Sequence, residues 1–263
     1  MLGDILTATR RRVDEQRAVR PQHVLERLAA SAPPALDLAA ALRRPGVQLI
    51  AEIKRRSPSR GSLHPDLNPA ALAVAYGQGG AAAVSVLTEP TFFAGSLDDL
   101  AAARAGLRCE GQALPILRKD FILDPYQVVE ARAHGADAVL LIVAALSGAD
   151  LRRLYGQACA LGLSVLVEVH NEAELDQALA MQPSIVGINS RNLRDMTVDL
   201  TVVERLRPLA PAGVLVVAES GIHSVEDVRR LRAMNVDAML VGEALVRAAN
   251  PAEVTRQFVE AGQ

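Results

Sequence analysis

Tryptophan is absent from this chain of 263 residues, and aromatic side chains make up only 3% of it. A surface that binds nucleic acid by base stacking needs several aromatic side chains, so this composition argues against one. The net charge is −2 and the pI is about 6.2. Such a balance provides no positive field that would attract nucleic acid or an anionic membrane surface. We therefore expect neither nucleic acid nor a membrane among the partners.

Cysteine and long apolar runs are scarce as well. The two cysteines, Cys109 and Cys159, fit no metal-ligand spacing, which is typical of reduced thiols in a cytosolic protein. The histidines show no ligand spacing either, so we predict no metal site, and for His170 a cap or loop role is favoured. The longest apolar run, residues 138–146, is far shorter than the roughly 20 residues of a membrane-spanning helix. We expect a cytoplasmic protein.

What the chain does contain is an alternation of apolar strands and helices, in a sequence of which half is hydrophobic. Predicted strands cover residues 48–54, 82–87, 114–119, 137–143, 164–169, 185–189, 214–219 and 237–242. Predicted helices cover residues 69–78, 97–106, 125–134, 148–161, 171–181, 199–207, 224–233 and 251–261. Two of these helices start at capping patterns, Asn171 with Glu174 and Ser224 with Asp227.

Eight strands rich in Val, Ile and Leu that alternate with helices predict a parallel sheet covered by helices. The length is close to the about 250 residues of a (β/α)8 barrel and favours a closed barrel over an open sheet. No Gly-x-Gly-x-x-Gly follows the first strand, which removes the best sign of a dinucleotide-binding fold. Residues 1–45 read as two or three helices. We therefore predict a TIM (β/α)8 barrel, residues 46–263, with an N-terminal helical extension, residues 1–45, in a single domain overall.

The first predicted strand has one apolar face and one charged face. Because successive side chains of a strand point to opposite faces, residues 49, 51 and 53 share an apolar side. Glu52 and Lys54 lie together on the other side. Isolated charges are costly to bury unless they are paired or chemically active. A structural ion pair would explain this strand alone, but the pattern returns along the chain.

Other predicted strands also end in polar groups. Lys119 ends the third strand, Glu168 the fifth, Asn189 the sixth and Glu219 the seventh, while Gly242-Glu243 follows the eighth. The active sites of such barrels lie at the carboxyl ends of the strands. Polar groups at six of eight ends are hard to explain by folding needs, since burial alone favours apolar residues there. The sequence therefore predicts a catalytic mouth.

Two glycine-containing loops predict an anion site. Ser220-Gly221 follows the seventh strand and Gly242-Glu243 the eighth, each just before a helix. Glycine lets backbone N–H groups approach an anion, and this is the usual phosphate position in such barrels. The glycines could instead serve only tight turns. Ser57, in the basic loop of residues 55–61, adds a hydroxyl group, although that loop could also be a solvated one.

Lys54, Lys119 and Arg191 together exceed what one phosphate needs, so we expect a second anionic group on the ligand. Arg191 is the best candidate for a bidentate carboxylate clamp. Phe93 and Phe121 are rare aromatics that follow the second and third strands. They could sandwich a flat ring, although ordinary loop packing explains each of them equally well.

These residues together resemble a known family. The segments that carry the resemblance are Ala51-Glu-Ile-Lys-Arg-Arg-Ser-Pro-Ser, Ser85-Val-Leu-Thr-Glu, Leu117-Arg-Lys-Asp-Phe, Leu166-Val-Glu-Val-His, Gly187-Ile-Asn-Ser-Arg-Asn-Leu and Ala218-Glu-Ser-Gly-Ile. Their combination is similar to indole-3-glycerol phosphate synthase over the whole chain. Related phosphate-binding barrels share the glycine loops but not Glu-x-Lys-x-x-Ser-Pro-Ser together with Asn-Ser-Arg-Asn.

The resemblance implies a lyase of tryptophan biosynthesis that needs no cofactor. It would convert 1-(2-carboxyphenylamino)-1-deoxyribulose 5-phosphate into indole-3-glycerol phosphate, carbon dioxide and water. The resemblance implies that Lys119 is the general acid of cyclisation and that Glu168 is a proton-transfer partner in dehydration. Lys54 and Glu52 would complete the acid–base set, and which lysine serves which step stays open.

The resemblance also implies how the substrate is bound. Asn189 would orient the sugar hydroxyl groups, and Glu219 would support the array. The groups implied at the phosphate end are Ser57, Ser220, Gly221, Gly242 and Glu243.

Two other readings stay open. The chain could be another phosphate-binding barrel, such as phosphoribosylanthranilate isomerase or a thiamine phosphate synthase. The isomerase would need a Cys/Asp acid–base pair at strand ends, but neither cysteine is at a strand end. A non-catalytic binder of an anionic metabolite would not need two lysines and three glutamates in one mouth. The oligomeric state is open, and a monomer is plausible.

Overall fold

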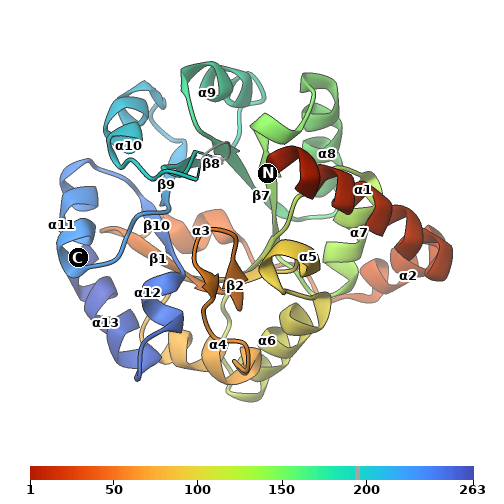
Figure 1. Cartoon of the computed structure of the whole chain (residues 1–263), viewed down its shortest axis with the longest axis horizontal. Coiled ribbons are helices and arrows are strands. Elements are labelled where there is room, and N and C mark those ends of the chain that lie inside the picture. Colours follow the sequence, from red (N-terminus) through yellow and green to blue (C-terminus); the bar gives the residue numbers. More distant parts are fainter. Residues whose placement is uncertain (193–195) are drawn as a thin grey trace.

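Eight parallel strands close into a barrel in the computed structural model, which describes residues 1–192 and 196–263 (Figure 1). Strand β1 pairs with both β4 and β10, which closes the sheet. The prediction of a (β/α)8 barrel is confirmed, and each barrel strand lies within its predicted range. The strands are β1 (Gln48–Ile53), β4 (Ala83–Leu87), β5 (Ile116–Lys119), β6 (Ala138–Ile142), β7 (Ser164–Val169), β8 (Ile185–Asn189), β9 (Leu215–Glu219) and β10 (Ala238–Val241).

The helices form a ring around the strands (Figure 1). The predicted ones are α4 (Pro69–Gln78), α6 (Leu97–Cys109), α7 (Pro125–Ala133), α8 (Gly148–Ala160), α9 (Glu172–Leu179), α10 (Thr201–Leu206), α11 (Val225–Ala233) and α13 (Pro251–Gly262). The Asn171 side chain accepts a hydrogen bond from the Glu174 backbone N–H, and Ser224 and Asp227 form a capping box. These caps satisfy backbone donors that the first helical turn leaves free, so they mark the helix starts.

Several short elements lie outside the predicted pattern. They are β2 (Arg56–Ser57) and β3 (Gly61–Ser62), which form a hairpin over the barrel mouth, α5 (Pro90–Phe93), α12 (Glu243–Val246) and the 3₁₀ turns Val143–Ala145 and Arg207–Leu209. None of them exceeds four residues. Such segments are too short to show a period of 2 or 3.6 in the sequence.

The alternation of side chains along the strands produces two apolar clusters. The outer side chains of β1 and β7 pack with the surrounding helices. The inner side chains Ile50 and Leu166 belong to a second cluster inside the barrel. Leu38 and Leu42 of α3 (Leu38–Leu42) join that inner cluster, and the Leu38 backbone N–H donates to Ser164 at the start of β7. Helix α3 therefore closes the amino-terminal end of the barrel, and the opposite end is left for polar groups.

The predicted N-terminal extension packs on the side of the barrel next to α7. It consists of α1 (Leu2–Val19), α2 (Gln22–Ser31) and α3. Val13 of α1 and Leu25 of α2 share an apolar cluster with Tyr126 of α7. The start of α1 reaches the carboxyl end of the strands, where Ile5 joins the inner cluster. The extension therefore touches both ends of the barrel.

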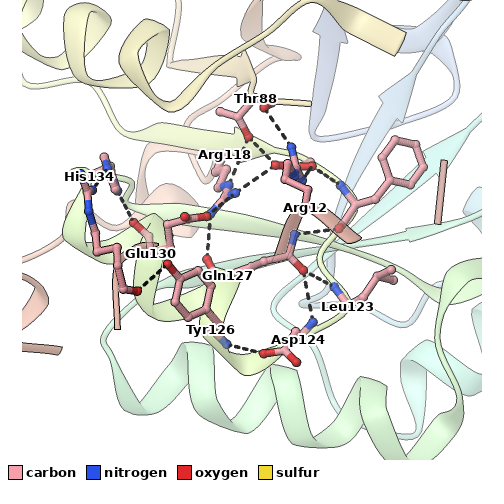
Figure 2. A network of polar contacts seen from close by, with 12 residues as sticks. Arg12, Thr88, Arg118, Leu123, Asp124, Tyr126, Gln127, Glu130 and His134 are labelled. Atoms are coloured by element: carbon pink, nitrogen blue, oxygen red, sulfur yellow. Dashed lines mark hydrogen bonds and ion pairs between the residues drawn. The ribbon is translucent and has the colours of Figure 1, made fainter. Parts of the chain in front are cut away.

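A buried ion-pair network ties α1 to the end of β5 (Figure 2). Arg12 donates to Asp120 at 2.8 Å, and Asp120 also accepts from Arg118 at 3.0 Å and from Thr88 at 2.7 Å. Arg118 is in turn paired with Glu130 at 2.9 Å. Removing one partner of a buried pair leaves an uncompensated charge, which costs about 3–5 kcal/mol. The network therefore fixes the backbone just beyond Lys119.

Over the described ranges 1–192 and 196–263, no helix is both long and apolar enough to cross a membrane.

Candidate active site

A cavity opens at the carboxyl ends of the barrel strands. It brings together every site residue predicted from the sequence. The strands contribute charged and amide groups, and the loops contribute hydroxyl groups, glycines and two aromatic rings. The predicted residues that line it are Glu52, Lys54, Ser57, Phe93, Lys119, Phe121, Glu168, Asn189, Arg191, Glu219, Ser220, Gly221, Gly242 and Glu243.

Lys119 lies at the centre of the charged part of this cavity. Its ammonium nitrogen is 2.5 Å from a carboxylate oxygen of Glu219 and 3.5 Å from one of Glu168. A second pair lies nearby, since Lys54 is 2.5 Å from Glu52. All three carboxylates are at least 94% buried as side chains. Such charges are tolerable out of water because each one has a partner of opposite sign.

Two glycines provide the space for these carboxylates. A Cβ atom on Gly187 of β8 would collide with Oε1 of Glu219. Likewise, a Cβ atom on Gly242 would collide with Oε1 of Glu52. A side chain at either position would displace a carboxylate from its lysine. Gly187 was not among the predicted site residues, and its contribution is the absence of a side chain.

The same charges shift the pKa values of the central groups. Burial would lower the pKa of Lys119, but Glu219 and Glu168 raise it above its usual value. Burial raises the pKa of Glu219, Lys119 opposes this and Glu168 adds to it, with a result of about 7. Burial would also raise the pKa of Glu168, but Lys119, His170 and Asn189 lower it below its usual range. Lys119 is therefore a cation between two unequal carboxylates.

Ser220 and Gly221 form a strained turn at the end of β9. Their φ angles are +67° and +79°, in the left-handed region that a residue with a side chain rarely adopts. For Ser220 this conformation costs on the order of 1 kcal/mol. Strain of this kind persists where the surroundings enforce it, and here both residues line the cavity. The turn is a suitable place for backbone N–H groups to meet an anion.

The other end of the predicted phosphate site is formed by the β2–β3 hairpin and α12. Ser57 is buried, and its hydroxyl group accepts the Arg60 backbone N–H. The guanidinium group of Arg60 is 3.6 Å from the carboxylate of Glu243. The Glu243 side chain therefore carries an ion pair between the hairpin and α12. This pair offsets the repulsion that a lone carboxylate would exert on a phosphate.

Arg191 lies at the same side of the cavity. Its guanidinium group donates to the Ser59 hydroxyl at 3.2 Å and to the Met196 carbonyl oxygen at 3.1 Å. Burial lowers the pKa of Arg191, and the charges of Glu243 and Arg60 act on it with opposite signs. Since Arg60 and Glu243 belong to the phosphate end, Arg191 is within reach of that end as well. Its predicted role as a carboxylate clamp stays a prediction.

Phe93 and Phe121 lie against each other. Their ring centroids are 6.2 Å apart and their planes are tilted by 37°. To hold a third ring between them, the two rings would have to be parallel and about 7 Å apart, with a contact of about 3.5 Å on each side. In this structure the two rings instead form one apolar wall, over which a flat ring can lie.

No group of three or more His, Cys, Asp or Glu side chains that could hold a metal ion occurs among the residues outside 193–195. The chemistry available to this cavity from its own side chains is proton transfer and electrostatic stabilisation of anions.

A closed (β/α)8 barrel with acid and base side chains at one mouth, next to glycine loops suited to an anion, defines an enzyme that transfers protons on a small anionic substrate. Sequence comparison narrows the class. Residues 2–258 match the family model described as "Indole-3-glycerol phosphate synthase". The chain belongs to the indole-3-glycerol phosphate synthase family.

Curated relatives agree with the family model. The chain is 50% identical to "Indole-3-glycerol phosphate synthase 2" of Streptomyces coelicolor over 259 residues, which cover 98% of both chains. It is 47% identical to "Indole-3-glycerol phosphate synthase" of Mycolicibacterium smegmatis over 262 residues, which cover 100% of this chain and 94% of the relative.

Solved structures with much lower identity share the fold. A 3-hexulose-6-phosphate synthase from Salmonella typhimurium aligns with a TM-score of 0.63 at 14% identity, over 82% of this chain and 98% of that one. A thiamine phosphate pyrophosphorylase from Pyrococcus furiosus aligns with a TM-score of 0.62 at 18% identity, over 86% and 97%. At such identities the likeness shows the barrel fold alone.

Sequence reasoning missed several residues of the site. Met1, together with Leu2 and Ile5 of α1, lines the cavity, whereas no predicted site residue lies in the N-terminal extension. Asp120 lies beside Lys119 in the chain and also lines the cavity, and it holds the backbone N–H of Phe121 at 2.8 Å. The contact between Arg12 and Asp120 spans 108 residues, so no local pattern could reveal it.

Proposed function

We propose that this cavity binds 1-(2-carboxyphenylamino)-1-deoxyribulose 5-phosphate and closes its five-membered ring. This is the reaction of the family to which the chain belongs, so the chain is an indole-3-glycerol phosphate synthase, a carboxy-lyase of tryptophan biosynthesis. The observation that carries the assignment of roles is Lys119, held between Glu168 and Glu219 at the cavity's centre. The enzyme acts on a small phosphorylated substrate.

The substrate has three recognisable parts that match three parts of the cavity. Its phosphate fits the strained turn at Ser220-Gly221 together with Ser57 and Gly242. Its flat ring fits the wall formed by Phe93 and Phe121. Its carboxylate needs a cation, and Arg191 and Lys54 are the candidates.

In the first step the ring carbon that bears the carboxylate attacks the ketone carbon. A carbon–carbon bond forms, and the electron pair of the C=O bond moves to oxygen, which takes a proton from Lys119. Because neighbouring carboxylates raise the pKa of Lys119, it keeps its proton until the strongly basic alkoxide develops. Asn189, 8% exposed, lies in the same cavity and is placed to orient the hydroxyl groups of the open chain.

The next steps restore the aromatic six-membered ring and make the new five-membered ring aromatic. Loss of carbon dioxide leaves its bonding electrons in the six-membered ring. The hydroxyl group then leaves as water with a proton supplied by an acid of the site, and the neighbouring methylene carbon gives its proton to a base. Glu168 is suited to be that base, because its environment keeps it ionised. Lys54 and Glu52 form the second acid–base pair, 2.5 Å apart.

A direct assay tests this function. The purified chain is mixed with the carboxyphenylamino-deoxyribulose phosphate, and indole fluorescence and carbon dioxide are followed together. We expect one carbon dioxide for each indole-3-glycerol phosphate. Absence of both products from a folded chain would contradict the proposal. Conversion of phosphoribosylanthranilate in a parallel sample would favour the isomerase instead.

We also propose that the enzyme works in the cytoplasm as a monomer, with neither nucleic acid nor a membrane as a partner. Light scattering on the purified chain should then give a mass near 27.9 kDa. A mass of twice this value would contradict the monomer.

A further inference from the structure

His170 contacts the site residue Glu168 from outside the cavity. It follows β7 directly, and it does not belong to the cavity lining. Its Nε2 atom is 3.4 Å from Oε1 of Glu168, and the other carboxylate oxygen of Glu168 is 3.5 Å from the Lys119 ammonium group. The two oxygens of Glu168 therefore face two different basic groups. One of these groups reaches the substrate space and the other does not.

Glu174 holds the far side of the imidazole ring. Its Oε2 atom is 2.9 Å from Nδ1 of His170 and accepts the His170 backbone N–H at 2.9 Å. Its Oε1 atom accepts from the side-chain amide of Asn171 at 2.8 Å. These contacts, in the first turn of α9, leave the carboxylate little freedom to move. The chain of contacts runs from Lys119 through Glu168 and His170 to Glu174.

The geometry also determines the charge of the ring. An ionised Glu174 can only accept, so Nδ1 must carry a proton. A neutral ring would then present the lone pair of Nε2 to the carboxylate of Glu168, which is repulsive. A protonated ring donates an N–H to Glu174 and brings its positive charge to 3.4 Å from Glu168, with which Nε2 forms an ion pair but no hydrogen bond. Burial would lower the pKa of His170, but its contacts with the carboxylates of Glu168 and Glu174 raise it to about 10.

We propose that His170, clamped by Glu174, is a positioning residue that holds Glu168 ionised and oriented for proton transfer. This inference rests on the proposed function, and it adds to that function two residues that touch no substrate. It also explains why the two carboxylates around Lys119 differ. Glu168 faces two cations, Lys119 and His170. Glu219 faces Lys119, and its Oε1 atom has no hydrogen-bond partner among the described residues.

A merely structural role for His170 would be to cap α9, as the sequence pattern favours. Loss of such a cap would lower thermal stability and would leave the pH dependence of turnover unchanged. Loss of a positioning cation raises the pKa of Glu168 and so moves the acidic limb of the kcat profile to higher pH. The two roles are therefore separated by a pH profile.

The experiment compares His170→Phe, His170→Gln and Glu174→Gln in the full chain, with kcat and KM measured between pH 3 and 9, because the pKa of Glu168 lies below its usual range. Glutamine keeps a polar contact but no charge. We expect kcat at pH 7 to fall roughly 10–100-fold in both His170 variants, the size typical of losing a group that orients a reacting one. KM should stay within about threefold, and the acidic limb should move up by about one pH unit or more. Glu174→Gln should show the same changes at smaller size.

The matched control is Glu172→Gln. It makes the same substitution in the same first turn of α9, where Glu172 pairs with Arg205 at the surface and has a side-chain exposure of 48%. Its pH profile should superimpose on that of the unaltered chain. If the profiles of His170→Phe and His170→Gln also superimpose, the positioning role is wrong.

A second readout is independent of the substrate. The ring nitrogens of His170, observed by NMR, should show a protonated imidazole through pH 8 and a lower titration midpoint in Glu174→Gln. A ring that is neutral at pH 7 overturns the proposal even if the enzyme is active. A protonated ring in a chain that makes no indole product would support the clamp and contradict the proposed function instead.

Discussion

Arg118 and Lys119 are consecutive cations on β5, and their side chains leave the strand on opposite faces. Arg118 points outward and is 1% exposed, with ion pairs to Asp120 and Glu130 and a hydrogen bond to the Gln127 carbonyl oxygen (Figure 2). Lys119 points into the cavity, where its partners are Glu168 and Glu219. One residue along a strand therefore separates a cation of the framework from a cation of the active site.

The two side chains differ in kind as well as in place. The planar guanidinium group of arginine donates several fixed hydrogen bonds and keeps its proton, which suits a closed network. The ammonium group of lysine is a compact charge that can transfer its proton. Two partners of Arg118, Gln127 and Glu130, lie on α7 outside the cavity, whereas the partners of Lys119 line the substrate space. Asp120 also lines the cavity, but its carboxylate accepts from Arg12, Arg118 and Thr88. The outer network should therefore govern stability, and the inner one should govern turnover.

The largest effect on the inner network is expected for Glu168→Gln. The substitution preserves the shape of the side chain but removes the base and one partner of Lys119. We expect kcat to fall by roughly 10²–10⁴-fold, the usual contribution of a general acid or base. The melting temperature should change by only a few degrees. Steady-state indole fluorescence with a parallel thermal scan measures both, and a kcat within tenfold of normal would argue against the assignment.

On the outer network, Arg118→Met should cost stability instead of turnover. It leaves Asp120 and Glu130 buried without one of their cations, for which we expect a loss of about 3–5 kcal/mol in the free energy of unfolding. Arg153→Met is the matched control, because its ion pair with Asp150 is exposed and is worth about 1 kcal/mol or less. Urea titration measures the difference. Equal losses in the two variants would contradict the role of the buried network.

Gly187→Ala tests whether the inner carboxylates need the missing side chain. The added methyl group collides with Glu219 and should shift it away from Lys119. We expect kcat to fall on the order of 10–100-fold, as small misplacements at a reacting centre do. Gly156→Ala is the control, since its added Cβ meets no atom within 4 Å beyond its chain neighbours and the backbone of its own helix. Unchanged kcat in Gly187→Ala would show that Glu219 can move freely.

Arg191→Ala should weaken substrate binding with little change in kcat. The loss of a charge-assisted contact corresponds to roughly tenfold in KM or more. Inhibition by glycerol phosphate and by N-methylanthranilate, measured separately, tells which anion Arg191 binds. Weaker inhibition by the carboxylate alone supports the clamp, and weaker inhibition by the phosphate alone moves Arg191 to the phosphate end. Unchanged affinity for both would remove Arg191 from the site.

The smallest effect concerns the pH dependence of stability. Burial would raise the pKa of Asp120, but Arg12 and Arg118 lower it below its usual value of 3.8. A lowered pKa in the folded state stabilises the protein above the unfolded value, and this contribution is lost as the pH falls through the folded value. Asp120→Asn should therefore reduce stability more at pH 7 than at pH 3. Equal losses at both pH values would contradict this.

The strand pattern predicted most of the inner network, because alternation along a strand assigns each side chain to a face. Lys119, Glu168 and Glu219 could be placed in one mouth on that basis alone. The outer network could not be predicted, since its key contact joins Arg12 to Asp120 over 108 residues. Gly187 was missed for another reason. Its role is to leave space for the Glu219 carboxylate of the neighbouring strand, and the sequence does not show which side chain fills that space. His170 was noticed, but its position behind Glu168 depends on how Glu174 turns back from α9.

The most direct test of the account is the turnover of Lys119→Ala beside that of Arg118→Met, both assayed as folded protein at saturating substrate. The account predicts that Lys119→Ala loses at least about 10²-fold in kcat, while Arg118→Met keeps kcat within a few-fold below its lowered melting temperature. Near-normal turnover of Lys119→Ala would contradict the central claim that the inward cation of β5 is the acid of ring closure.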